Sequence, residues 1–291
     1  MTNILTVDVE DYFHPTEVQR TVDPSRWDSF PSRVEEATSI VLDLLDAAGV
    51  KATFFILGWV AQRRPRLVRR IAGAGHELGC HSFSHALVFR LSPQEFRRDT
   101  TLAIDAISQA AGVRPRAYRA PRFSITARSW WALEILAECG FQADSSIYPV
   151  RHDRYGIPGH PFFPHRIQTP SGAILEVPPA SVPLGANHNA PAGGGAYLRL
   201  LPRSYLAAAI RLLNGVHRAP ACLYVHPWEF DPDQPRLASG AVARLRTYLG
   251  LRSMAAKLAR LLADFPFAPL SDVCPPGGAY PSLHPPLPRN R

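Results

Sequence analysis

The sequence lacks the long apolar run that a membrane-spanning helix needs. A leader peptide is not expected either, because the polar start Met1–Asn3 passes directly into a predicted strand. Arginines are spread along the chain without a basic run or a series of stacking aromatics, which argues against nucleic-acid binding. These absences favour a soluble protein without a membrane span and without a nucleic-acid partner.

Cysteine is scarce, with 4 residues in a chain of 291. The four residues are Cys80, Cys139, Cys222 and Cys274. Their spacing matches no paired motif, and three of them stand in apolar segments, so we expect reduced thiols in the core. Reduced thiols in turn favour a cytoplasmic location.

Length and charge are compatible with one large enzyme domain. α/β barrels commonly use a chain of this length without dividing into two domains. The formal net charge of +8 indicates an anionic neighbour, such as a charged glycan or a membrane surface.

Predicted strands and helices alternate, which indicates parallel strands with helices outside them. The predicted helices cover 34–48, 65–74, 96–111, 129–139 and 204–214, and the predicted strands cover 4–8, 52–57, 141–145, 174–177 and 222–226. Between 148 and 196 the pattern gives way to Pro, Gly and His, which predicts substrate-facing loops. The Pro-rich tail 274–291 is predicted to be disordered.

Two histidines four residues apart, His81 and His85, form the most informative motif. On one helical turn this spacing places both rings on the same face, close enough to share a metal ion. Two unrelated loop histidines are the alternative. A hydrolytic metal site normally has three protein ligands and an open position, so a third ligand must come from elsewhere in the chain.

Three carboxylates, Asp8, Glu10 and Asp11, follow the first predicted strand. The C-terminal ends of strands are where α/β folds bind ligands. In an extended chain Asp8 and Glu10 share a face, so that one could bind a metal while the other acts as a base. A helix N-cap is the alternative interpretation of this acidic cluster.

Two more strand ends carry reactive side chains. Arg119 is placed to pair with a carboxylate and hold it ionised. His226 ends an apolar strand and is suited to protonate a leaving group. Glu229 would either orient His226 or close the loop after it. We also expect Asp144 and the serines after it to hydrogen-bond Arg119 or the substrate.

Ordered motifs in this chain resemble those of the NodB-homology polysaccharide deacetylases, carbohydrate esterase family 4. These motifs are Thr6-Val7-Asp8, His81-Ser82-x-x-His85, Arg119-x-Pro121 and the strand that ends at His226. A closer resemblance is to the branch encoded with exosortase and PEP-CTERM exopolysaccharide loci. It is carried by the segments 8–14, 193–195, 200–202 and 226–232.

The resemblance implies an α/β fold, a distorted (β/α) barrel of about seven strands. It assigns residues 1–273 to one deacetylase domain that includes a family-specific C-terminal extension. It also implies roles for individual residues. Asp8 would be the catalytic base, Arg119 the residue that tunes it, His226 the general acid, Arg122 the donor of an oxyanion-binding backbone N–H, and His81 and His85 metal ligands.

One departure from the family pattern concerns the metal carboxylate. The commonest family motif is Asp-Asp-Gly, with the second Asp on the metal, whereas this chain has Val9 at that position. Relatives with Asp-x-Asp point to Glu10 as the ligand here, with Asp11 as the competitor. The implied cofactor is a divalent metal, Zn²⁺.

The function implied is removal of N-acetyl groups from an N-acetylhexosamine in an exopolysaccharide, an oligosaccharide or a lipid-linked precursor. The sequence does not distinguish N- from O-deacetylation or a monomer from an oligomer. Two rivals stay open: a metal-free, allantoinase-like hydrolase of cyclic amides on the same fold, and a non-catalytic glycan-binding protein. A matched base, acid and ligand set argues against a protein that only binds.

Overall fold

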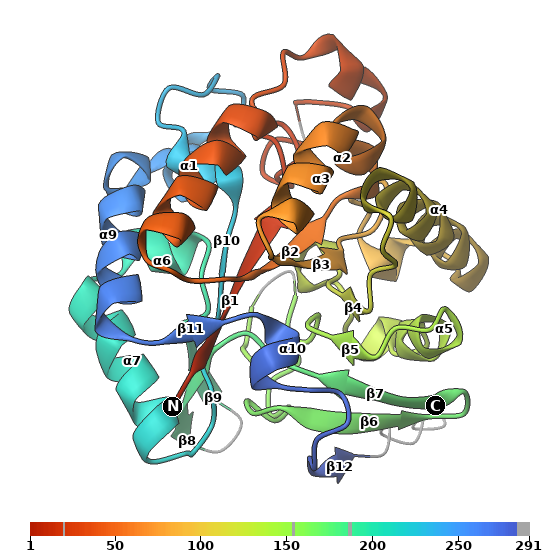
Figure 1. The fold of residues 1–291 in the computed structure, drawn as a ribbon, viewed down its shortest axis with the longest axis vertical. Helices are drawn as coiled ribbons and strands as arrows, with labels where there is room; N and C mark the ends of the chain where they lie inside the picture. Colours follow the sequence, from red (N-terminus) through yellow and green to blue (C-terminus); the bar gives the residue numbers. More distant parts are fainter. Residues whose placement is uncertain (20, 153–154, 186–187, 284–291) are drawn as a thin grey trace.

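The computed structural model describes residues 1–19, 21–152, 155–185 and 188–283 (Figure 1). Within these ranges the chain forms an α/β fold around a mixed sheet in which seven neighbouring strands run parallel. From one end of the parallel run to the other they are β10 (Cys222–Val225), β1 (Asn3–Val9), β2 (Thr53–Ile56), β3 (Glu77–Cys80), β4 (Ala117–Tyr118), β5 (Ala143–Asp144) and β7 (Gly172–Glu176). The expected distorted barrel of about seven strands is thus confirmed.

Helices lie outside this sheet, as the alternation predicts (Figure 1). They are α1 (Val34–Ala47), α2 (Gly58–Arg63), α3 (Pro65–Gly73), α4 (Pro93–Ala111), α5 (Ala132–Glu138), α6 (Ala196–Leu200), α7 (Arg203–Gly215), α8 (Ala241–Tyr248), α9 (Leu251–Asp264) and α10 (Leu270–Val273). None of the helices in the described ranges is both long and apolar enough to cross a membrane.

Local chemistry explains where the helices begin and end. α4 begins after Ser92, whose hydroxyl accepts from the backbone N–H of Glu95 while the Glu95 carboxylate accepts from that of Ser92. It ends at Gly112, which adopts the left-handed conformation at φ 74°. In the sheet, every residue of β1 is buried, as expected for a parallel strand covered on both faces.

Irregular backbone joins the two ends of the parallel run, β7 and β10. The N–H of Ala180 donates to the carbonyl of Cys222 at 2.9 Å. The N–H of Tyr224 donates to the carbonyl of Gly193 at 2.7 Å, and the N–H of Gly195 donates back to the carbonyl of Tyr224 at 3.2 Å. This seam is why the barrel is distorted, because loop residues replace a regular strand at one position.

The segment 148–196 holds more regular structure than predicted. β6 (His165–Thr169) pairs antiparallel with β7, and β8 (Ser181–Gly185) pairs with β9 (His188–Pro191) in a separate hairpin. The predicted strand 174–177 is confirmed as β7, whereas β6, β8 and β9 lie where loops were predicted. These three strands are short, and β8 and β9 contain proline, so none of them has the long apolar pattern that predicts a strand.

The tail prediction was wrong for residues 274–283. β12 (Ser282–Leu283) pairs in parallel with β6, and Arg166 donates to the carbonyl of Gly278 at 2.9 Å. Cys274 is buried. Backbone hydrogen bonds therefore anchor this Pro-rich stretch, while residues 284–291 lie outside the described ranges. All four cysteines are free thiols, and Cys80, Cys222 and Cys274 are buried, as expected.

We expect Gly194→Ala to break the seam. Gly194 has φ +153°, and an added Cβ would lie 1.8 Å from the carbonyl oxygen of Tyr224. The free energy of unfolding, measured in urea, should fall by about 2–4 kcal/mol. Gly215→Ala is the control, since its Cβ would meet no described atom within 4 Å at the end of α7. Equal stability of the two variants would contradict this account.

Candidate active site

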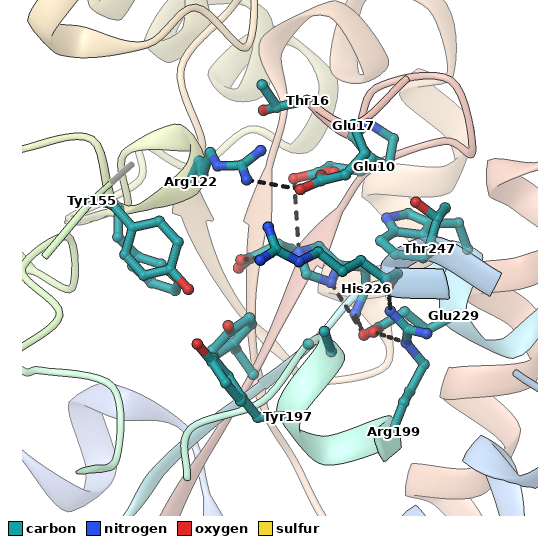
Figure 2. Close-up of a pocket in the computed structure, with 18 of the residues that line it drawn as sticks. Glu10, Thr16, Glu17, Arg122, Tyr155, Tyr197, Arg199, His226, Glu229 and Thr247 are labelled. Carbon is teal, nitrogen blue, oxygen red and sulfur yellow. Dashed lines mark hydrogen bonds and ion pairs between the residues drawn. The ribbon is translucent and has the colours of Figure 1, made fainter. Parts of the chain in front are cut away.

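A cavity of about 260 Å³ opens at the C-terminal ends of β1 and β10 (Figure 2). Asp8 and Glu10 reach it from the end of β1, and His226 reaches it from the end of β10. His85 lines it from the loop after β3. The candidates from distant parts of the sequence therefore meet at one end of the barrel, where parallel α/β folds place their sites.

Glu10, His81 and His85 form a buried cluster whose ligand atoms all lie within 4.8 Å of one another. Oε1 of Glu10 is 3.1 Å from Nε2 of His81 and 2.9 Å from Nε2 of His85. Nδ1 of His81 donates to the carbonyl of Arg119 at 2.8 Å, which leaves a lone pair on Nε2. A lone pair facing a carboxylate oxygen calls for a proton or a cation between them.

The donors of this cluster fit a divalent metal ion, because two imidazole nitrogens and one carboxylate oxygen are a common catalytic zinc set. Burial by itself would raise the pKa of Glu10, but neighbouring His85 and His226 hold it well below its usual range. Glu10 is therefore ionised and able to act as a ligand.

The two histidines reach the cluster from a loop and not from a helical turn, so that part of the prediction was wrong. Ser82 and His85 have φ values of 62° and 54°, which fold the segment after β3 back on itself. Asp99 of α4 fixes this loop by accepting from the N–H of Phe83 at 2.8 Å and that of Ser84 at 3.0 Å. The loop thus brings the two histidine rings together, as a helical turn was expected to do.

Asp11 faces away from the cluster. Its carboxylate accepts from the backbone N–H groups of Tyr12, Arg33 and Val34 at 2.9–3.2 Å. The capping alternative is thus correct for Asp11, which serves the start of α1, and Glu10 is the carboxylate of the candidate metal set. Burial raises the pKa of Asp11 to about 6.

Arg119 and Asp8 form a buried ion pair, with 2.8 Å between Nη1 and Oδ1. The guanidinium also donates to Thr6 Oγ1 at 2.6 Å and to Ser145 Oγ at 2.8 Å. The predicted pairing of Arg119 with a carboxylate is confirmed. Because Arg119 is fully buried, the orientation of Asp8 is fixed by a rigid partner.

His226 lines the cavity next to Glu229 (Figure 2). Its Nε2 is 3.9 Å from Oδ2 of Asp8, and its Nδ1 is 3.1 Å from Oε2 of Glu229. Burial by itself would lower the pKa of His226, but the carboxylates of Glu10 and Glu229 raise it to about 9. The imidazole is therefore held as a cation with one nitrogen aimed at the cavity.

Glu229 orients His226 and also closes the loop after it, so both predicted roles are present. Its Oε2 accepts from the backbone N–H of His226 at 2.9 Å. Its Oε1 accepts from Nε of Arg199 at 2.6 Å, and both side chains are buried. Sequence reasoning missed Arg199, since a single arginine in a short helix carries no motif.

Arg122 adopts a left-handed backbone at φ 55° and lines the cavity. Its Nη2 donates to Oε1 of Glu17 at 2.7 Å (Figure 2). The rings of Tyr155, from the segment predicted to face substrate, and of Tyr197, on α6, also line the cavity. Charged and aromatic side chains therefore share the cavity wall, a combination that suits a polar molecule with flat faces.

Asp144 lies on β5, directly before Ser145, which contacts Arg119. It pairs in register with Glu176 on β7, and Ser146 donates to its Oδ1 at 2.6 Å. The expected hydrogen bonds to Arg119 from this group come from Ser145, whose carbonyl and hydroxyl oxygens accept from the guanidinium at 3.2 and 2.8 Å. Burial raises the pKa of Asp144 to about 6, and burial next to Asp144 raises that of Glu176 well above its usual range.

Comparison with known families divides the chain in two. Residues 21–143 match the polysaccharide deacetylase family, and residues 145–275 match a domain of unknown function, DUF3473. The boundary lies at β5, inside the parallel run, so both parts contribute strands to one barrel.

Curated relatives match over about a third of the chain. A stretch of 100 residues is 36% identical to a peptidoglycan-N-acetylglucosamine deacetylase of Bacillus cereus, covering 34% of this chain and 36% of that protein. Another of 101 residues is 36% identical to a chitooligosaccharide deacetylase of Bradyrhizobium, covering 34% of this chain and 43% of that protein. The matched part is less than half of either relative.

Solved structures extend the likeness to nearly the whole chain, for the fold alone. A putative polysaccharide deacetylase from Mycobacterium smegmatis superposes with a TM-score of 0.59 at 23% identity, covering 93% of this chain and 87% of that one. A carbohydrate esterase family 4 pseudoenzyme from Bacillus anthracis gives 0.52 at 14% identity, covering 97% and 69%.

We expect Glu10→Gln to lower the affinity for Zn²⁺, measured by calorimetric titration, by about tenfold or more, because it removes the only charged donor of the cluster. Asp11→Asn should leave that affinity unchanged and lower the melting temperature, since it weakens the start of α1. The reverse order of the two affinities would assign the ligand role to Asp11.

We expect Glu176→Gln to flatten the pH dependence of stability. The native state holds the Glu176 proton above its ordinary pKa of 4.5, so the free energy of unfolding of the wild type should fall as pH rises from that value through the raised native pKa. The variant should lose most of this fall. Urea denaturation from about pH 5 to 9 measures it, with exposed Glu36→Gln as the control. Parallel curves for wild type and Glu176→Gln would refute the assignment.

Proposed function

Since the chain carries a polysaccharide deacetylase domain of the carbohydrate esterase family 4 (NodB) type, we propose that it hydrolyses the N-acetyl group of an N-acetylhexosamine in a glycan. The observation that carries the proposal is the meeting of three groups at one cavity. These groups are the Glu10, His81 and His85 cluster, the Asp8–Arg119 pair and the His226–Glu229 pair.

Glu10, His81 and His85 would hold a divalent metal ion, which we propose to be Zn²⁺. When bound, such an ion polarises the acetyl carbonyl and lowers the pKa of a water molecule. The proposed set leaves the side toward the cavity open, because its three side chains reach the site from β1 and the loop after β3. An open side of this kind is the mark of a catalytic rather than a structural metal site.

Asp8 is the proposed general base. Arg119 holds one carboxylate oxygen, Oδ1, at 2.8 Å, so the other oxygen, Oδ2, remains to take the proton of an attacking water. As the carbonyl carbon becomes tetrahedral, the backbone N–H of Arg122 is the proposed donor to the developing oxyanion.

His226 is the proposed general acid. Glu229 binds Nδ1 and so directs Nε2 into the cavity, toward the side on which Asp8 lies. The imidazolium can then protonate the departing sugar amine. Arg199 forms an ion pair with the other oxygen of Glu229, Oε1. This pair favours the ionised carboxylate and holds it in place.

The proposed substrate is an N-acetylated exopolysaccharide or its precursor. The relatives named above act on peptidoglycan and chitooligosaccharides, which share the N-acetylated sugar. Aromatic rings at the cavity wall suit the flat faces of a pyranose, and the motif resemblance to the exopolysaccharide branch supports the finer assignment. A cytoplasmic location stays a prediction.

Acetate release from N-acetylated and O-acetylated oligosaccharides, with chelator and with added Zn²⁺, tests this proposal. Release that requires metal and an N-acetyl group is the expected result. Metal-independent hydrolysis of a cyclic amide would favour the allantoinase-like rival, and glycan binding without any release would favour a binding protein.

Asp8→Asn should separate the base from the ligands. The variant keeps the shape of the side chain but cannot take a proton, so turnover should fall by ~10²–10⁴-fold while bound metal is unchanged. Asp43→Asn, exposed on α1, is the matched control and should behave as wild type. An Asp8→Asn enzyme with wild-type turnover would disprove the assignment.

A further inference from the structure

Helix α8 packs Ala243 and Tyr248 against the core but exposes its larger aliphatic side chains. Val242 is 63% exposed, Leu245 54% and Leu249, directly after the helix, 52%. Their spacing of three and then four residues places them on one side of the helix. In a helix packed on a core this stripe faces inward, whereas in α8 Thr247 is the residue that is buried. The outward stripe indicates a surface built to contact something else.

The stripe lies beside the mouth of the catalytic cavity. Arg246 and Thr247 of α8 line the cavity, as does Leu200 at the end of α6, which is 40% exposed. Arg199 ties the two helices together, because it donates to the carbonyls of Arg246 and Leu249 at 2.6 Å each. Figure 2 shows Thr247 and Arg199 on the same side of the cavity as His226 and Glu229. The stripe is thus rigidly linked to the site.

Basic residues are frequent in the part of the sequence that carries this stripe. From Gln234 to Ala263 the sequence has no acidic residue and six basic ones. These are Arg236, Arg244, Arg246, Arg252, Lys257 and Arg260. Arg236, Arg244 and Arg252 are exposed, while Lys257 points inward and donates to carbonyls of α6. Part of the net charge of +8 therefore comes from the same stretch of sequence that carries the exposed apolar side chains.

We propose that this region, the α8 surface (Leu200, Val242, Leu245 and Leu249 with Arg236, Arg244 and Arg252), docks on an anionic lipid bilayer. Apolar side chains enter the interface while long basic side chains reach the headgroups, the pattern of helices that lie in the membrane plane. Each arginine near an anionic leaflet adds to the attraction.

Charge decides between a bilayer and a second copy of the chain. A symmetric dimer through the α8 surface would bring the exposed arginines of one copy close to those of the other, and these like charges repel. An anionic leaflet complements the same arginines. Docking stands apart from the proposed catalysis. If the α8 surface docks on the leaflet, the mouth of the cavity would face a glycan held there. This consequence rests on the proposed function.

Vesicle co-sedimentation of the full chain tests the proposal. Wild type should bind vesicles of phosphatidylcholine with phosphatidylglycerol and not vesicles of phosphatidylcholine alone. Leu245→Ser with Leu249→Ser should weaken this binding by about tenfold or more. Arg244→Gln with Arg252→Gln should weaken it similarly and reduce its dependence on salt.

Matched controls are Val216→Ser, at a site 70% exposed beyond the end of α7, and Arg128→Gln, exposed before α5. Both should bind as wild type. Equal binding by the Leu245→Ser, Leu249→Ser variant, or equal binding to both kinds of vesicle, would overturn the proposal. So would a change in mass by light scattering in that variant, which would assign the surface to self-association.

Acetate release from a soluble oligosaccharide separates this proposal from the proposed function. The two double variants should release acetate as wild type does, because none of the four residues lines the cavity. Vesicle binding by a chain that releases no acetate would leave the α8 surface standing and remove the deacetylase proposal. Acetate release by a chain that ignores vesicles would do the opposite.

Discussion

The buried guanidinium of Arg119 is the interaction on which the rest of the site depends. A cation removed from water must be paired, and its partners come from two strands: Thr6 and Asp8 from β1, and Ser145 from the end of β5. Arg119 also accepts a hydrogen bond from His81 at its carbonyl and so fixes which nitrogen of His81 faces Glu10. The side chain and backbone of one residue thereby position both the proposed base and a proposed metal ligand.

Charges of alternating sign run across the cavity from this residue. Arg119 pairs with Asp8 at 2.8 Å, His226 lies 3.9 Å beyond, Glu229 is 3.1 Å from the far nitrogen of His226, and Arg199 ends the series at 2.6 Å. Each of the three inner groups, Asp8, His226 and Glu229, has a neighbour of opposite charge on either side, so the proposed base and the proposed acid lie inside a balanced array. Such an array is electrostatically organised before any substrate arrives.

Periodicity predicted parallel strands with helices outside them, because buried strands and amphipathic helices have apolar residues at characteristic spacings. The barrel itself was implied by the family resemblance. The positions of Asp8, His81, Arg119 and His226 at strand ends marked them as candidates, and the resemblance implied their roles. Contacts between residues far apart in the chain could not be predicted, because they produce no pattern in the sequence. The spacing of His81 and His85 is satisfied by a loop that Asp99 anchors from α4, and Arg199 reaches Glu229 from thirty residues away. The assignment between Glu10 and Asp11 needed the orientation of two adjacent side chains.

The division of the chain at β5 has a consequence for how the catalytic apparatus can be inherited. The chain before β5 supplies the proposed base Asp8, the candidate ligand cluster and Arg119, whereas the chain after β5 supplies the proposed acid His226 with Glu229 and Arg199. Asp8 and Glu10 precede residue 21, where the deacetylase match begins. Neither matched segment therefore holds both the proposed base and the proposed acid. A recombination that exchanged the second segment would therefore have to transfer His226, Glu229, Arg199 and the glycine seam together. Without them, the first half of the barrel would lack the proposed acid.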